Sequence, residues 1–300
     1  MSHSRSQLDA TAIGLMVVFC TLWGVQQVAI KFATPGISPV WQAAIRSIGA
    51  CLLVLAWTRL RGISLRVHDG TLLPGLLAGV LFAGEFALLY AGLLFTTASR
   101  GVIFLYTAPF IVSLGAVLML PGEHMRRIQW IGLALAFGGV LALFGDSLFR
   151  PSGETWLGDA MILLAAVFWA STTLTVKLSR LATAAPEKTL LYQLGVSALV
   201  LPVIAALLGE AGVVQLSGTV VLSMLFQIVC VASISYVGWF WLVRHYPATR
   251  LSAFSFLTPV MGVLAGIVVL GEPLNPSVLA ALALVGTGIW LANRPSRRAP

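Results

Sequence analysis

Long apolar stretches, separated by short turns, run along almost the whole chain. An apolar run of about 20 residues can cross a bilayer as a helix, which satisfies its own backbone hydrogen bonds. The stretches lack the alternation of polar and apolar residues that a membrane barrel requires. We therefore predict an all-α polytopic membrane protein with ten transmembrane helices, at residues 12–32, 38–58, 72–95, 101–120, 128–145, 157–177, 188–208, 218–242, 251–270 and 276–292.

The same landmarks occur twice along the chain. The segment LWGVQQVAIK at 22–31 returns as FWASTTLTVK at 168–177, an offset of 146 residues. Three further landmarks of the first half return in the second half at offsets of 150 and 149: Arg100 as Arg250, Pro109 as Pro259, and Gly122-Glu123 as Gly271-Glu272. We therefore divide the chain into two five-helix halves, residues 1–147 and 148–300.

The distribution of Lys and Arg predicts the orientation of the helices. Cytoplasmic loops of membrane proteins are enriched in these residues. If the N-terminus is cytoplasmic, 14 of the 18 Lys and Arg residues fall in cytoplasmic segments, whereas Lys31, Arg100 and Arg150 fall in outer ones. Both termini are then cytoplasmic. Because each half has an odd number of helices, the second half is inverted relative to the first, an arrangement that recurs in secondary transporters.

The composition agrees with a membrane protein. Hydrophobic residues make up 59% of the chain and charged residues 9%, whereas an ordinary soluble domain has about 25% charged residues. The connections are too short for a separate soluble domain. The three cysteines lie in apolar stretches, which favours packed side chains over disulfides. The net charge of +8 is explained by the Lys and Arg residues in the predicted cytoplasmic segments, so we expect no nucleic-acid partner.

The landmarks resemble those of the EamA-type family of the drug/metabolite transporter (DMT) superfamily. The resemblance covers nearly the whole chain and rests on the order, spacing and duplication of the Trp23, Lys31, Arg100, Pro109 and Gly122-Glu123 landmarks. It implies a carrier in a bacterial-type cytoplasmic (inner) membrane that moves small organic solutes, often outward. Members of that family handle amino acids, other metabolites and drugs, so the resemblance leaves the solute open.

Two ionisable side chains, Arg46 and Glu85, lie well inside predicted helices. Charged residues in a membrane cost about 2.5–3.5 kcal/mol each on insertion scales and commonly mark functional sites. Both lie at a similar depth, so we expect them to form a pair that lines a central cavity, with Arg46 able to meet an anionic group of the solute. A permanent structural ion pair is the alternative. Glu85 also makes protons a candidate coupling partner, unless Arg46 holds it ionised.

Polar and aromatic residues inside the apolar stretches supply further candidates for the cavity wall. Gln26 and Gln27 match Thr172 and Thr173 at the offset of 146, and one residue of each pair should face the bundle. Hydrogen bonding between helices is the alternative role for these four residues. The remaining candidates form an amphipathic set, part of which belongs to the interfacial aromatic belt: Trp41, Gln42, Tyr90, Tyr106, Trp169, Tyr192, Gln193, Tyr236 and Trp239.

Pro109 and Pro259 fall in the middle of equivalent predicted helices. A proline inside a helix removes one backbone hydrogen bond and bends the helix. A static bend that serves packing is one interpretation. Because the pair is symmetric across the two halves, we also consider the two prolines as hinges for alternating access.

Transport is the function that these observations favour, and the solute is expected to be an amino acid or a related small metabolite that is exported. A broad-specificity drug efflux carrier is the first alternative. An integral-membrane enzyme is the alternative from another class, but the chain has no HExxH or GxSxG motif. The chain also has no GxxxxGK[ST] motif, which argues against an ATP-driven pump in a single chain. We expect no catalytic residues, no metal and no cofactor, and we expect the lipid bilayer and a small organic solute as partners.

Overall fold

The computed structural model describes residues 7–66, 69–149, 155–271 and 276–294. Thirteen α-helices follow one another along these ranges: α1 (Ala10–Ala33), α2 (Pro39–Leu60), α3 (Leu72–Gly92), α4 (Ala98–Leu105), α5 (Ala108–Met119), α6 (Arg127–Phe144), α7 (Thr155–Leu178), α8 (Pro186–Leu207), α9 (Gly218–Phe226), α10 (Tyr236–His245), α11 (Ala248–Phe254), α12 (Leu257–Leu270) and α13 (Pro276–Ala292). Two short 3-10 helices, η1 (Gly145–Phe149) and η2 (Arg180–Thr183), and one π-helix, η3 (Gln227–Ser235), complete the described elements.

The predicted all-α membrane fold is confirmed. Within the described ranges, nine helical segments are long and apolar enough to cross a membrane, and α13 adds a shorter apolar helix of 17 residues. The observed helices begin and end within a few residues of the predicted spans. The prediction of ten spans therefore agrees with the nine to ten long apolar helices of this fold, whereas the inversion of the second half stays a prediction.

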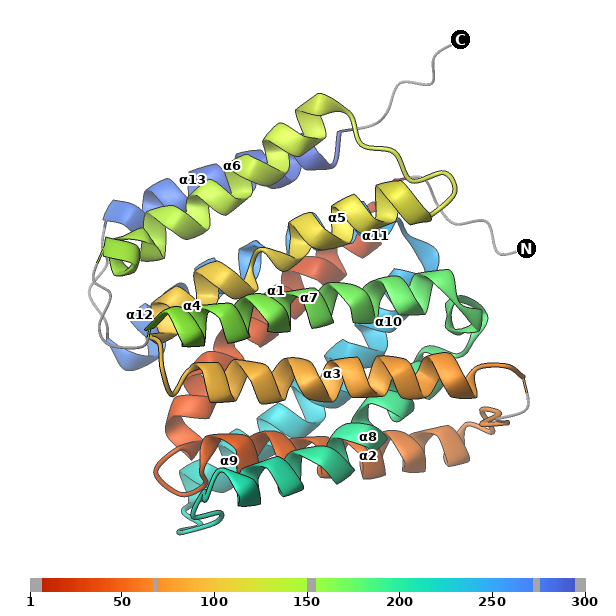
Figure 1. Ribbon diagram of the computed structural model, residues 1–300, viewed down its shortest axis with the longest axis vertical. Coiled ribbons are helices and arrows are strands. Elements are labelled where there is room, and N and C mark those ends of the chain that lie inside the picture. The colour runs from red at the N-terminus through yellow and green to blue at the C-terminus, as the bar shows by residue number, and fades with distance from the viewer. Residues whose placement is uncertain (1–6, 67–68, 150–154, 272–275, 295–300) are drawn as a thin grey trace.

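The helices run back and forth between two ends of the bundle (Figure 1). We call the end at which α1 begins the near end, and the end at which α1 finishes the far end. Helices α6 and α13 pack side by side along one edge, and α2 packs against α8 at the opposite edge. Between these pairs, α3 and α7 pack together, and α1 packs against α12. Each of these contacts joins helices that are distant in the sequence.

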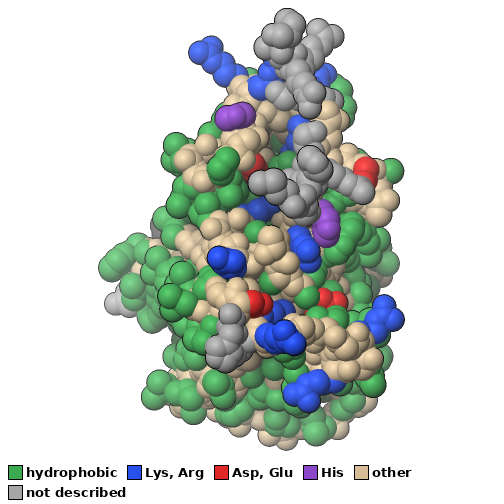
Figure 2. Space-filling model, turned by 90° about the vertical axis from the view of Figure 1, so that its right-hand side faces the viewer, with side chains coloured by type: hydrophobic (Ala, Val, Ile, Leu, Met, Phe, Trp, Pro, Cys, Tyr) green, Lys and Arg blue, Asp and Glu red, His purple; other side chains and the backbone are tan. Residues whose placement is uncertain are grey.

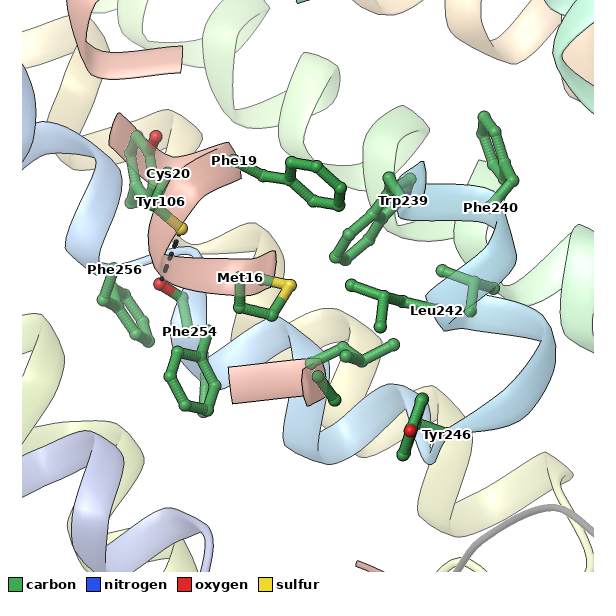
Figure 3. Packing of buried hydrophobic residues seen from close by; sticks show 14 of the residues in the cluster. Met16, Phe19, Cys20, Tyr106, Trp239, Phe240, Leu242, Tyr246, Phe254 and Phe256 are labelled. Atoms are coloured by element: carbon green, nitrogen blue, oxygen red, sulfur yellow. Dashed lines mark hydrogen bonds between the residues drawn. The ribbon is translucent and has the colours of Figure 1, made fainter. Parts of the chain in front are cut away.

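Two predicted helices are broken, which corrects the expectation of continuous helices with a proline in the middle. Pro109 lies in the first turn of α5, and Pro259 is the third residue of α12. Proline is tolerated there because an amide N–H in a first helical turn has no partner within the helix. At each break a side chain donates to a backbone carbonyl: Thr107 Oγ1 to Phe104 at 2.7 Å, where the Thr107 N–H also donates, and Cys20 Sγ to Phe254 at 3.3 Å (Figure 3).

The stretch between α9 and α10 contains a π-helix that the sequence pattern did not predict. The hydroxyl groups of this segment return to the backbone, as when Ser233 Oγ donates to the Ile228 carbonyl at 2.7 Å. Ser235 Oγ accepts a hydrogen bond from Trp23 Nε1 at 2.8 Å, which ties the end of the π-helix to α1. π-helical turns inside helices frequently occur at functional sites, and this one leads directly into α10.

A buried ion pair holds the far end together. The Arg100 guanidinium pairs with the Asp159 carboxylate, which also accepts a hydrogen bond from Thr96 Oγ1 at 2.8 Å. Arg100 Nη1 further donates to the Ser147 carbonyl at 2.9 Å. In the second half, Arg250 Nη1 donates to the Asn293 carbonyl at 2.6 Å. Arg100 and its repeat Arg250 therefore each bind a carbonyl just beyond the end of a later helix, α6 and α13 respectively. Glu272, the repeat of Glu123, lies outside the described residues.

The loop between α2 and α3 is anchored to the start of α8 at the near end. Lys188 Nζ pairs with Asp69 at 2.6 Å and also donates to the Arg66 carbonyl. The hydrogen bond from Lys188 holds the pKa of Asp69 well below its usual range, with a further contribution from Thr71. Tyr192, one helical turn beyond Lys188, reaches the Thr71 hydroxyl at 3.1 Å, so loop and helix are joined at two levels.

Glycines allow the closest helix contacts in the bundle. A Cβ atom on Gly24 of α1 would lie 2.6 Å from the backbone nitrogen of Gly262 in α12. Gly132 of α6 and Gly288 of α13 approach each other in the same way, with the corresponding distances also near 2.5 Å. Small residues at helix interfaces let backbones approach within van der Waals contact, which is a main source of helix association in membranes.

We expect Gly24→Ala to destabilise the protein and Gly262→Ala to be tolerated, although the two glycines face each other. The added methyl group on Gly24 would overlap the α12 backbone, and such overpacking costs about 1–3 kcal/mol. A Cβ on Gly262 has 3.6 Å to its nearest neighbour, the Gly24 carbonyl oxygen, which is an ordinary contact. Thermal unfolding of the purified variants in detergent measures the difference. Equal losses for both variants would contradict this account of the contact.

Candidate functional site

A cavity of about 250 Å³ lies in the centre of the helix bundle. Its wall is built by α1, α3 and α4 together with α7, α8, α10 and α12. On one side the cavity reaches Ile30 and Leu93, which lie close to the far end of α1 and α3. Gln27 lines the cavity and is nevertheless exposed, so the cavity is open to the surface of the bundle beside the far half of α1.

Eleven of the residues predicted for a cavity wall line this cavity. They come from both parts of the chain and combine amide, hydroxyl, carboxyl and aromatic side chains: Gln26, Gln27, Glu85, Tyr90, Tyr106, Trp169, Thr172, Thr173, Gln193, Tyr236 and Trp239. The observation that pointed to them was a polar or aromatic side chain inside an apolar stretch. Their position is now defined, and their role in binding a solute is a proposal.

Trp41, Gln42 and Tyr192 do not line this cavity, which corrects the prediction for these residues. Trp41 packs against hydrophobic side chains at the far end. Gln42 is fully buried, and its amide donates to the Ile37 carbonyl at 2.9 Å. The Tyr192 ring lies over Gly75 of α3, where a Cβ would be 2.3 Å away. All three therefore serve helix packing, because the rotation of α2 and α8 turns them away from the cavity.

Thr172 and Thr173 line the cavity, and their hydroxyl groups bond within α7 rather than to another helix. Each hydroxyl donates back to its own helix, Thr172 to Phe168 at 2.9 Å and Thr173 to Trp169 at 3.3 Å. A threonine hydroxyl that bonds to the carbonyl four residues earlier keeps an acceptor lone pair available. Since both residues also line the cavity, this lone pair is available to a donor group of a solute.

Aromatic rings form a large part of the cavity wall, including several that were not predicted as site residues. Trp23 had been identified only as a repeat landmark, and Phe82 and Phe86 had not been distinguished from other apolar residues. Trp23 packs edge-on against Trp239 with ring centroids 5.7 Å apart, and Phe82 packs edge-on against Phe86 at 5.0 Å. A hydrophobic position in a transmembrane segment carries no signal that separates a cavity wall from a lipid-facing surface.

Arg46 and Glu85 are both buried, but they do not form the predicted ion pair. The Arg46 side chain is 1% exposed, and its Nε and Nη2 atoms have no hydrogen-bond partner among the described residues. Its guanidinium lies over the Phe86 ring, 4.5 Å from the centroid. Glu85 lines the cavity and interacts with Arg46 only electrostatically through space. The expectation that Arg46 itself lines the cavity is therefore corrected.

The cavity narrows towards the near end. A second space of only about 10 Å³ follows it, and Trp169, Thr173 and Trp239 line both spaces. Below these three residues, the second space is lined by side chains such as Val243 and Leu251, which are fully buried. Figure 3 shows Trp239, Leu242 and Tyr246 following one another along this packed region. The passage from the cavity to the near end is therefore closed in this structure.

Polar contacts seal the near end below this packing. The Glu123 carboxylate accepts hydrogen bonds from the backbone N–H groups of Ala248 at 2.7 Å and Thr249 at 3.0 Å, at the start of α11. Lys177 Nζ donates to the Tyr246 carbonyl at 2.5 Å. The Tyr246 hydroxyl in turn donates to Asp9 at 2.9 Å. These contacts join α1, α5, α7 and α11 at the near end.

The described residues do not assemble a metal centre. Within the ranges that the structure covers, no group of three His, Cys, Asp or Glu side chains is placed to hold a metal ion. The three cysteines are free thiols, and Cys20 is fully buried.

The sequence matches a known protein family over almost its whole length. The EamA-like transporter family matches residues 10–145 and again residues 156–294. An uncharacterized transporter of Bacillus subtilis, YvbV, is 28% identical over 97% of this chain and 94% of its own length. A probable amino-acid metabolite efflux pump of Salmonella typhimurium is 28% identical over 93% of both chains. A crystal structure with 19% identity has the same fold, with a TM-score of 0.81 over 95% of this chain and 97% of the other.

Arg46→Met should leave the stability of the protein unchanged or raise it. The substitution removes two buried donors that have no partner, and apolar replacement of buried ions is often neutral or stabilising by about 1–4 kcal/mol. The matched control is Arg100→Met, which leaves Asp159 without its cation and should cost about 3–5 kcal/mol. Thermal unfolding of both purified variants compares them. A loss for Arg46→Met as large as that for Arg100→Met would contradict this interpretation.

Proposed function

The chain belongs to the EamA-like transporter family, and we propose that it exports amino acids or related small metabolites by alternating access. It is a multi-pass membrane protein whose relatives are transporters. The observation that carries the proposal is the central cavity, which is closed towards the near end and is lined by hydrogen-bonding and aromatic side chains. The name of the relatives from Salmonella typhimurium and Escherichia coli, probable amino-acid metabolite efflux pump, supports the substrate class and the direction.

The cavity suits a solute of amino-acid size. Its volume of about 250 Å³ lies just below the range of about 300–1,000 Å³ that is usual for small-molecule pockets. Gln26, Gln193 and Thr172 provide hydrogen-bonding groups in the wall, and aromatic rings provide an apolar surface for a side chain. A polar group held by amides and hydroxyls, next to an apolar group held by rings, is the pattern of an amino acid.

Alternating access requires that the two halves of the chain adopt two different relative arrangements. We place the halves at residues 1–147 and 148–300, and we propose that the second half is inverted relative to the first. Three observations support the inversion. The family matches the chain twice. The first helix of each half packs against the broken helix of the other half, α1 on α12 and α7 on α5. The two breaks precede Pro109 and Pro259, which we propose as the hinges, because a broken helix bends at low cost.

We place the near end in the cytoplasm, together with both termini, in a bacterial-type inner membrane. Lys and Arg residues gather at this end, as Figure 2 shows for the surface that faces the viewer there. The described members of this group are Arg59, Arg61, Arg66, Arg126, Arg127, Lys177, Arg180, Lys188, Arg244, Arg250 and Arg294. Only Lys31 and Arg100 lie at the far end of the described helices. This asymmetry agrees with the enrichment of cations on the cytoplasmic side.

With this orientation the structure is open to the outside and closed to the cytoplasm. The cavity reaches the far end, whereas the Trp169 and Trp239 layer and the Glu123 contacts close the near end. Export would require these contacts to open so that a solute can enter from the cytoplasm. Protons are the candidate coupling ion, with Glu85 as the acidic group of the cavity that would exchange them.

Counterflow in proteoliposomes tests the transport proposal. Vesicles loaded with an unlabelled amino acid should take up the same labelled amino acid several-fold faster than unloaded vesicles, because a loaded carrier returns without having to reorient empty. The uptake should saturate with concentration, and the labelled compound should be recovered chemically unchanged. Protein-free vesicles are the control. Absence of trans-stimulation with every amino acid tested would refute the substrate class, and a changed compound would point to an enzyme.

Thiol labelling tests the orientation and the state of the protein. In intact cells, a membrane-impermeant maleimide should label Gln27→Cys and should not label Ser252→Cys, because Gln27 is exposed in the cavity and Ser252 lines the closed space. The unsubstituted protein, with its three native cysteines, gives the background. Labelling of Gln27→Cys only after the membrane is made permeable would reverse the proposed orientation.

A further inference from the structure

The charge in the cavity wall is of one sign. Among the described residues that line the cavity, Glu85 is the only acidic residue, and none is Lys or Arg. Nine of the lining side chains are aromatic, from Trp23 on α1 to Phe240 on α10. The wall therefore presents a single carboxyl group within a surface of rings. This composition selects one kind of ligand group.

The Glu85 carboxyl group has no hydrogen-bond or ion-pair partner in the part of the chain that the structure describes. Glu85 is 9% exposed, and this remaining exposure is towards the cavity that it lines. The Asp159 carboxylate is buried to a similar extent, but it is bonded to both Arg100 and Thr96. A buried carboxylate without a partner is costly, so a donor or cation that enters the cavity gains interaction energy there.

Arg46 does not neutralise Glu85 by a direct ion pair or hydrogen bond. Its guanidinium lies over the Phe86 ring and is 1% exposed, so the Phe86 side chain occupies the position between a solute and that cation. Of the two buried charges, only the negative one is therefore accessible from the cavity.

The rings around Glu85 favour the same kind of ligand. Phe82 and Phe86 flank Glu85 in sequence on α3, and Phe82 packs edge-on against Tyr236, with centroids 6.1 Å apart. Tyr236 itself packs edge-on against Trp23 at 6.3 Å. Aromatic faces attract cations through the ring quadrupole, most strongly where water is excluded. A carboxylate within a cluster of rings is thus complementary to an ammonium group that carries an apolar substituent.

We propose that Glu85 and the surrounding rings form a binding site for the ammonium group of the transported solute. This inference rests on the proposed function, in which the cavity binds the solute, and it adds which end of the solute is recognised. The positive nitrogen meets Glu85, and the attached apolar group lies against Phe82, Tyr236 and Trp23. Recognition of a solute carboxylate by Arg46 is not needed. Compounds without a cationic nitrogen are then poor ligands.

Binding to the purified full-length protein tests the site with three probes that share one phenyl group. Phenethylamine is a cation, 2-phenylethanol is neutral and 3-phenylpropanoate is an anion. Intrinsic fluorescence reports binding, because Trp23, Trp169 and Trp239 line the cavity. Phenethylamine should bind at least about tenfold more tightly than 2-phenylethanol, and 3-phenylpropanoate should bind most weakly. Equal or tighter binding of the anion, or no binding of the amine, overturns the proposal without the need for any variant.

The variant Glu85→Gln keeps the shape of the side chain and removes its charge. It should weaken phenethylamine binding by about tenfold or more and leave 2-phenylethanol binding unchanged. Glu187→Gln, which removes an acidic group at the near end outside the cavity, is the matched control and should change neither. Unchanged phenethylamine binding by folded Glu85→Gln protein overturns the assignment.

The failures of the two proposals are distinguishable. If amino acids show trans-stimulation in proteoliposomes but 3-phenylpropanoate binds as well as phenethylamine, transport stands and the ammonium site is refuted. If phenethylamine binds in a Glu85-dependent manner but no amino acid is transported, the ammonium site stands and the proposed substrate class is refuted.

Discussion

A helix that is interrupted within a membrane must find new partners for the backbone groups that it releases, and the central part of this protein depends on that requirement. At the breaks before Pro109 and Pro259, the side chains of Thr107 and Cys20 donate hydrogen bonds to the carbonyls of Phe104 and Phe254. With those carbonyls satisfied, the chain can turn at Tyr106 and place its ring in the cavity wall. Cys20 comes from α1, so the break in the second half is stabilised by a helix of the first.

The buried charges divide into two kinds. Arg100 and Asp159 satisfy each other and the adjoining backbone, and such fully bonded pairs fix one arrangement of the helices. Arg46 and Glu85 are also buried, but Arg46 has two donors without a partner and Glu85 faces the cavity. Of these two charges only Glu85 can meet a solute, and ionisable groups that face a cavity inside a membrane commonly mark functional sites.

Hydropathy and the duplicated landmarks were sufficient to predict the helices, because bilayer thickness sets their length and their apolar character. They also identified eleven of the cavity residues, since a polar or aromatic side chain in an apolar stretch has few other uses. The sequence could not reveal how far each helix is rotated. That angle depends on contacts such as Tyr192 over Gly75, and it turned Trp41, Gln42 and Tyr192 away from the cavity. The pairing of Asp159 and the π-helix of η3 likewise depend on neighbours that the local sequence does not specify.

The Glu123 contact has a consequence for the order of events in the proposed export cycle. Its carboxylate is covalently part of the first half, whereas the two amides that it binds begin α11 in the second half. Separating the halves at the near end therefore exposes a carboxylate and two helix-terminal amides at the same moment, before any solute has entered. In the proposed cycle, only the fraction of molecules that has already undergone this separation would load from the cytoplasm. The apparent affinity on that side would be lower than the intrinsic affinity by the same fraction, so the strength of one helix cap would set the solute concentration at which export begins.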